Sequence, residues 1–109
     1  MEPFIVRVTC YHLNSLGQPD GQIAAAYVPV EAPDEEEACK RAVLWHGDNG
    51  VAVEDHDLQW ICADAARGLL FKATKCLRVT PSEMDVFLLL TQGLHGSQVI
   101  GRTTRPSLT

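Results

Sequence analysis

Apolar and polar residues alternate in the first third of the chain as they do in β-strands. Residues 4–12 alternate, with Phe4, Val6, Val8, Cys10 and His12 on one face, and residues 23–31 form a second apolar run. The segment between them, residues 14–22, is rich in Asn, Ser, Gly, Pro and Asp, which favour turns. The pattern predicts two antiparallel strands joined by a hairpin, with Pro29 at an edge or at a strand end.

A helical pattern follows, and both of its ends are marked. Asp34 is placed as the N-cap, and Glu37, three residues later, completes a capping box. Glu36 with Lys40 and Glu37 with Arg41 have the favourable i,i+4 order, and a glycine follows residue 46. One side of this helix should pack on the sheet, and it comprises Ala38, Cys39, Ala42, Val43, Trp45 and His46. Leu44 falls outside this stripe, among the charges.

The middle of the chain predicts a second helix, capped by Asp55 or Asp57 and running to Arg67. Its apolar positions at helical spacing are Leu58, Ile61, Cys62 and Ala65. Trp60 falls on the opposite side, where it is either a contact residue for a partner or a cover for a neighbouring loop.

The last third predicts a strand and a third helix. Residues 69–80 alternate, with Leu69, Phe71, Ala73, Leu77 and Val79 on one face and Lys72, Thr74, Cys76 and Arg78 on the other. Thr80, Pro81 and Glu83 form a strong helix start, and the helix extends to about residue 92. Apolar side chains between residues 84 and 90 cover nearly its whole circumference, so it is expected to be central to the core or half of a subunit interface.

Together these elements predict an α+β domain, a short and mainly antiparallel sheet with helices on one face in the order ββααβα. A further strand is expected at residues 97–103. The 109 residues, 46% of them hydrophobic and 21% charged, suit one folded domain over residues 1–101 with a polar, mobile tail at 102–109. No apolar run approaches the roughly 20 residues that span a membrane, and the N-terminus lacks a signal-peptide pattern, so we expect a cytoplasmic location.

The four cysteines, at positions 10, 39, 62 and 76, include no Cys-x-x-Cys pair. Neither a zinc ribbon nor a redox motif is therefore indicated. Their positions in apolar patterns predict reduced structural thiols.

Charge is unevenly distributed, with a formal net charge of −5. Residues 31–57 contain nine acidic residues against Lys40 and Arg41, whereas residues 67–80 contain four basic residues and no acidic one. The first hypothesis is a small non-enzymatic interaction protein that presents an acidic surface to a basic partner that handles nucleic acid, as antitoxins, immunity proteins and phage-encoded inhibitors of this size and sign do. Its predicted binding residues are Asp34, Glu35, Glu36, Glu37, Leu44, Asp48, Asp55, Asp57 and Trp60.

Other functional classes have weaker support. His46, Asp48, His56 and Asp57 would be the residues of a small metal-dependent hydrolase, although adjacent residues on an extended chain point to opposite sides. A nucleic-acid module would use Arg67, Lys72, Lys75 and Arg78, against the overall charge and without the aromatic residues of a stacking platform. A self-associating accessory subunit would use residues 84–90. No nucleophile elbow or phosphate loop occurs, and we expect no cofactor, no membrane contact and no direct nucleic-acid binding.

Overall fold

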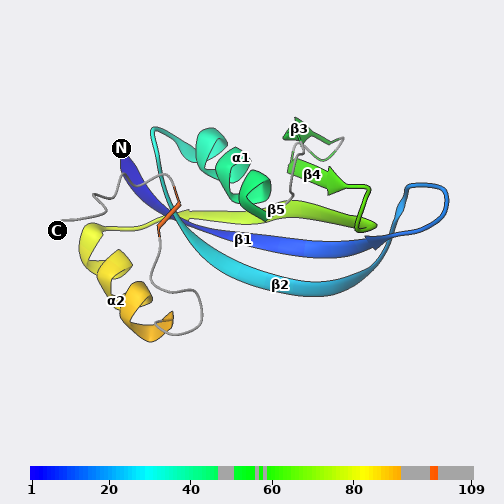
Figure 1. Cartoon of the computed structure of the whole chain (residues 1–109). Helices are drawn as coiled ribbons and strands as arrows, with labels where there is room; N and C mark the ends of the chain where they lie inside the picture. The colour runs from blue at the N-terminus through cyan, green and yellow to red at the C-terminus, as the bar shows by residue number, and fades with distance from the viewer. Residues whose placement is uncertain (47–50, 56, 58, 92–98, 101–109) are drawn as a thin grey trace, which may run out of the picture.

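A computed structural model describes residues 1–46, 51–55, 57, 59–91 and 99–100 of the chain. The elements, in the order ββαβββα, are β1 (Glu2–Leu13), β2 (Pro19–Ala32), α1 (Glu35–His46), β3 (Val53–Glu54), β4 (Trp60–Asp64), β5 (Leu69–Arg78) and α2 (Pro81–Thr91) (Figure 1). The five strands form one sheet in the order β2-β1-β5-β4-β3, and every neighbouring pair is antiparallel. The α+β class and the antiparallel sheet are confirmed, and the predicted element order is wrong.

The error in element order lies between residues 55 and 67, where the strand β4 replaces the predicted helix. The short strand β3 precedes it. Asp55 Oδ1 accepts the backbone N–H groups of Asp57 and Gln59 at 2.9 and 3.0 Å, and this turn leads from β3 into β4. In β4, Cys62 pairs with Phe71 of β5 and is completely buried. Short apolar runs fit helical and strand periods almost equally well, and pairing with β5 decides this case. Leu58, one of the four positions that suggested a helix, lies outside the described residues.

Helix α1 covers one face of the sheet, as predicted (Figure 1). Asp34 Oδ1 accepts the N–H of Glu37 at 2.8 Å, which confirms the N-cap. The core beneath the helix contains side chains with no exposed surface, among them Phe4, Val6, Val30, Ala38, Ala42 and Val43. Trp45, at the margin of the predicted stripe, is instead 55% exposed.

A register shift in β5 changes which of its side chains face α1. β1 pairs Arg7 with Lys75 and Val8 with Ala73, so that Thr74 is the extra residue of a bulge. The Thr74 hydroxyl donates to the carbonyl of Arg7 at 3.3 Å and lies 3.0 Å from the Thr9 hydroxyl. Beyond the bulge, Cys76 pairs with Val6 and therefore faces α1. Leu77 pairs with Ile5, on the opposite face, and is 55% exposed. The prediction that placed Leu77 with Phe71 and Cys76 away from it was wrong, because strict alternation takes no account of a bulge.

Helix α2 lies on the other side of the sheet from α1 (Figure 1). Its capping box is confirmed, because Thr80 Oγ1 accepts the N–H of Glu83 at 3.1 Å and Glu83 Oε1 accepts that of Thr80 at 2.8 Å. Met84 is the one fully buried side chain among the described residues of this helix. The predictions that both helices share one face and that this helix could be central to the core are therefore wrong. Its apolar sequence reflects contact on one side and exposure on the other.

The end of the chain adds one bridge to β2. Ile100 pairs in parallel with Val30, accepting the N–H of Glu31 at 2.8 Å and donating to the carbonyl of Pro29 at 2.9 Å. The predicted C-terminal strand is thus present in part, and Pro29 lies in an edge strand as expected. Residues 97–98 and the predicted tail at 102–109 lie outside the described residues. Among those described, no helix is long and apolar enough to cross a membrane.

Candidate functional site

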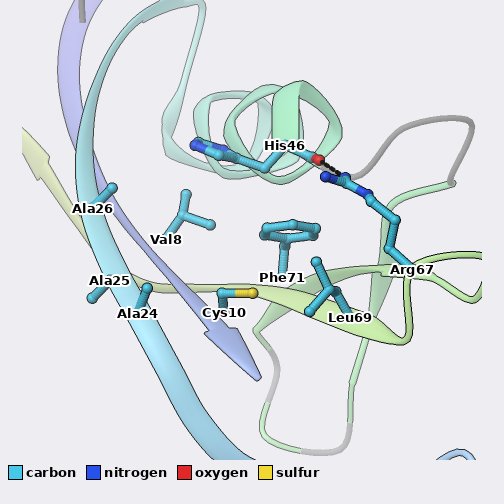
Figure 2. A pocket seen from close by; sticks show the side chains of 9 residues that line it. All are labelled: Val8, Cys10, Ala24, Ala25, Ala26, His46, Arg67, Leu69 and Phe71. Atoms are coloured by element: carbon cyan, nitrogen blue, oxygen red, sulfur yellow. Dashed lines mark hydrogen bonds between the residues drawn. The ribbon is translucent and has the colours of Figure 1, made fainter. Parts of the chain in front are cut away.

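A pocket of about 270 Å³ opens where α1 ends above the sheet (Figure 2). Its floor and walls are apolar side chains of β1, β2 and β5, including Val8, the small residues Ala24 and Ala26, and Phe71. The imidazole of His46 forms part of the roof, with its ring centroid 5.6 Å from that of Phe71. The pocket was not predicted, although three consecutive alanines in a strand were a signal of surface left open by small side chains.

The charged group of this pocket, Arg67, is already engaged (Figure 2). Its Nη2 donates to the backbone carbonyl of His46 at 2.7 Å and its Nε donates to Asp64 Oδ2 at 2.6 Å. The hydrogen bond from Arg67 lowers the pKa of Asp64 against the opposing effect of burial. Burial raises the pKa of the Cys10 thiol, which also lines the pocket. The pocket therefore suits a small apolar group.

The predicted metal-dependent site is divided between the two faces of the sheet. His46 packs above Phe71 on the face that α1 covers, and its Nδ1 lies 3.1 Å from the carbonyl of Ala42. Asp57 Oδ2 lies 3.6 Å from Nζ of Lys72. Lys72 pairs with Thr9 of β1, and both side chains lie on the sheet face opposite to α1. Asp48 and His56 fall outside the described residues. Within the described part of the chain, no three His, Cys, Asp or Glu side chains are grouped as metal ligands.

The predicted acidic surface consists of two groups with different surroundings. In the first turn of α1, Glu36 and Glu37 reach Lys40 and Arg41 at 3.0 and 3.7 Å. Glu35 forms no ion pair with another described residue. These glutamates surround the N-terminal end of α1 and remain solvent-accessible.

The second acidic group lies beside β3, beyond the C-terminal end of α1 (Figure 1). Lys72 Nζ lies 3.0 Å from Asp55 Oδ2 and 3.6 Å from Asp57 Oδ2. Burial alone would raise the pKa of Asp55, but hydrogen bonds from Gln59, Lys72 and Asp57 lower it overall. This group neutralises a partly buried lysine and offers less free charge than the sequence suggested.

Trp60 and Leu44, the predicted apolar anchors, both lie near α1. Trp60 is partly buried against the core, with Lys40 Nζ 4.4 Å from its ring centroid. This cation–π contact explains the position of its ring without a partner. Leu44 is 40% exposed, so it remains available on the outer side of α1.

Three of the four basic residues predicted for a nucleic-acid module have carboxylate partners. Arg67 pairs with Asp64, Lys72 with Asp55 and Asp57, and Arg78 with Glu2 at 3.2 Å. Lys75 forms no ion pair with another described residue. These four residues therefore offer little free positive charge for phosphate.

Three large aliphatic side chains of α2 are exposed. Val86, Leu89 and Leu90 are 56, 70 and 75% exposed. Their spacing is i, i+3, i+4, so they form one stripe that points away from the sheet. Phe87, on the side facing the sheet, lines a groove of about 290 Å³ with Ile5, Arg7, Tyr27, Lys75 and Leu77. We call Val86, Leu89 and Leu90 the α2 stripe.

We compared the chain with known families, curated proteins and solved structures. No protein-family model, no curated protein and no solved structure matches the chain.

Proposed function

We propose that the chain is a small, non-enzymatic protein-interaction module that acts as a homodimer joined through α2. The observation that carries the proposal is the α2 stripe, three large aliphatic side chains at i, i+3, i+4 spacing that face water. Such a stripe is the usual contact surface of a helix, and here the sheet of the same chain lies on its other side.

A second copy suits the α2 stripe because an antiparallel pair of identical helices is self-complementary. A two-fold axis through the stripe places Val86 of one copy near Leu90 of the other, and closes the assembly at two subunits. The acidic residues of α2, Glu83 and Asp85, lie toward its N-terminal end. In an antiparallel pair these ends are apart, so like charges do not meet.

The expected affinity is modest. Full burial of a Val or Leu side chain contributes about 1.5–3 kcal/mol, so the exposed parts of the two stripes contribute roughly 6–12 kcal/mol together. Association costs about 4–15 kcal/mol in lost freedom, so the helix contact alone leaves a small net gain. Burial of neighbouring Leu77 and Tyr27, which are 55 and 52% exposed, would add to it. The balance of these terms predicts a weak dimer that forms at high protein concentration.

Analytical ultracentrifugation over a wide concentration range tests the dimer, with Leu89→Lys as the disrupting variant. Leu44→Lys is the matched control, since Leu44 is an exposed leucine on the outer side of α1. We expect wild type and Leu44→Lys to reach twice the monomer mass, and Leu89→Lys to remain monomeric with an unchanged circular dichroism spectrum. Wild type that stays monomeric at high concentration, or a Leu89→Lys protein that still dimerises, would overturn the proposal.

The acidic first turn of α1 supports a second candidate, an inhibitor-like module that docks on a basic, nucleic-acid-handling protein. Glu35, Glu36 and Glu37 project from one rigid helix start, and Glu35 is uncommitted among the described residues. Carboxylates so placed compete for the Arg and Lys side chains that contact phosphate, and attract such a partner at long range. In this candidate Leu44 and Trp60 flank the acidic group as apolar contacts.

A nuclease-treated pull-down from the native host, eluted in salt steps, tests this second candidate. The variant in which Glu35, Glu36 and Glu37 are all changed to Gln should lose a basic, salt-released partner, because the attraction depends on their charge. Leu89→Lys is the control that keeps the acidic turn intact. Retention of the same partner at the same salt by the triple variant would reject the acidic surface.

A further inference from the structure

Two cysteines distant in sequence face each other between α1 and β5. Cys39 lies on α1 beside the buried Ala38, and Cys76 is turned toward α1 by the bulge at Thr74. Both pack against the same hydrophobic core, and both are only partly buried. Figure 1 shows α1 lying above β5, and more of the helix contacts this strand than any other.

Each thiol shifts the pKa of the other, and the two shifts have opposite directions. The hydrogen bond with Cys76 lowers the pKa of Cys39, against the opposing effects of burial and of the Glu35 carboxylate. The same hydrogen bond, followed by burial, raises the pKa of Cys76, and Arg78 opposes this only weakly. Cys39 is therefore the more readily ionised thiol of the pair. A thiolate that contacts a second thiol is the arrangement from which disulfides form.

The strand register separates the other two cysteines, Cys10 and Cys62, from each other. Cys10 and Cys62 both pair with Phe71, from opposite sides of β5, so they are two strands apart. Two strand spacings are about 9.5 Å, beyond the roughly 7 Å between Cα atoms that a disulfide permits. Cys62 is also completely buried.

We propose that Cys39 and Cys76 are a reversible oxidation site, converted to a disulfide by a peroxide. The Cys39 thiolate attacks one peroxide oxygen, and the O–O bond breaks. Hydroxide is released from the peroxide, and Cys39 becomes a sulfenic acid. The Cys76 sulfur then attacks the Cys39 sulfur, the S–O bond breaks, and the hydroxyl group leaves with the Cys76 proton as water. Overall, two thiols and one hydrogen peroxide give one disulfide and two waters. A low-molecular-weight dithiol reduces the bond again.

The disulfide would fix α1 to the sheet. It closes a loop between residues 39 and 76, and cross-links over loops of this length restrict the unfolded chain strongly. The oxidised protein should therefore unfold at a temperature roughly 10 °C above that of the reduced protein. The inference is independent of the proposed dimer, because α2 takes no part in it.

The test is treatment of the folded, full-length protein with one equivalent of hydrogen peroxide, followed by alkylation and mass spectrometry. Trypsin with a glutamate-specific protease separates all four cysteines into different peptides. We expect one linked pair of peptides, containing Cys39 and Cys76, and a thermal shift that dithiothreitol reverses. Cys39→Ala and Cys76→Ala should each abolish the link and the shift, whereas Cys10→Ala, the matched control, should retain both.

Three results would overturn the proposal: a link that involves Cys10 or Cys62, sulfinic acid at Cys39 with Cys76 still alkylated, or four alkylated cysteines after treatment. Each is measured on the wild-type protein, so the test does not depend on the folding of any variant.

Discussion

The two helices of this chain begin alike and end in opposite surroundings. Both start with a side-chain cap whose oxygen accepts an N–H three residues later, Asp34 at 2.8 Å and Thr80 at 3.1 Å. α1 then buries Ala38, Ala42 and Val43 against the sheet and directs charged residues outward. α2 buries Met84 and directs Val86, Leu89 and Leu90 outward. The comparison shows that local signals determine where a helix starts, whereas the neighbouring sheet determines whether its apolar side chains serve the core or a partner.

The largest predicted difference between the helices is in the free energy of unfolding after the same Val→Ala substitution in each. Val43→Ala removes fully buried methyl groups from α1 and should lower the free energy of unfolding by about 2–3 kcal/mol. Val86→Ala removes the same groups from the 56% exposed position on α2 and should change it by less than about 0.5 kcal/mol. Urea unfolding followed by circular dichroism, at protein concentrations below the dimer range, measures both. Equal losses would show that α2 is packed as tightly as α1.

The sequence was sufficient for the parts of the fold that local chemistry determines. The β1–β2 hairpin and both capped helix starts follow from alternation and from short motifs at Asp34 and Thr80. The β4 strand was missed because Cys62 is buried by pairing with β5, a contact that the local pattern does not contain. The reversal of Leu77 and Cys76 was missed because the bulge at Thr74 depends on the register with β1.

The candidate sites were less predictable than the fold. Asp55 and Asp57 were predicted as helix caps and as part of an acidic surface. In the structure they instead lie beside Lys72, which approaches them because β4 pairs with β5. The facing thiols of Cys39 and Cys76 also depend on the bulge. For the third helix the sequence left two alternatives, a place in the centre of the core or in a subunit interface. The helix is apolar on every side, so only tertiary contacts distinguish the two.

Removal of the two N-caps should also affect α1 and α2 differently, by a smaller amount than the valine substitutions. Asp34→Ala should lower the global free energy of unfolding by about 1 kcal/mol, because α1 is part of the core. Thr80→Ala removes a similar bond from a helix anchored mainly by Met84, so it should increase local opening of α2 and leave global stability nearly unchanged. Amide hydrogen exchange separates the two, with faster exchange confined to α2 in Thr80→Ala. A global loss of the same size in both variants would contradict the difference in anchoring.

The smallest predicted effect concerns the C-terminal end of α1. Arg67 donates to the carbonyl of His46, and Asp64 orients the guanidinium by accepting from Nε. A carboxylate whose pKa is lowered in the folded protein stabilises it above the ordinary value of 3.8, and this contribution is lost as the pH falls through the lowered pKa. Asp64→Asn should therefore reduce the melting temperature near neutral pH, and the difference from wild type should disappear in acid. Amides in the last turn of α1 should exchange faster in the variant.

Asp55→Asn is the matched control for this end of α1. The pKa of Asp55 is also lowered, by hydrogen bonds from Gln59, Lys72 and Asp57 that outweigh burial, so this variant should show the same direction of pH dependence. Its partners lie beside β3 and β5, so exchange in the last turn of α1 should not change. If Asp55→Asn accelerated that exchange as much as Asp64→Asn did, the bond from Arg67 to His46 would not be what holds the last turn of α1. The contrast between α1 and α2 would then rest on the burial of their side chains only.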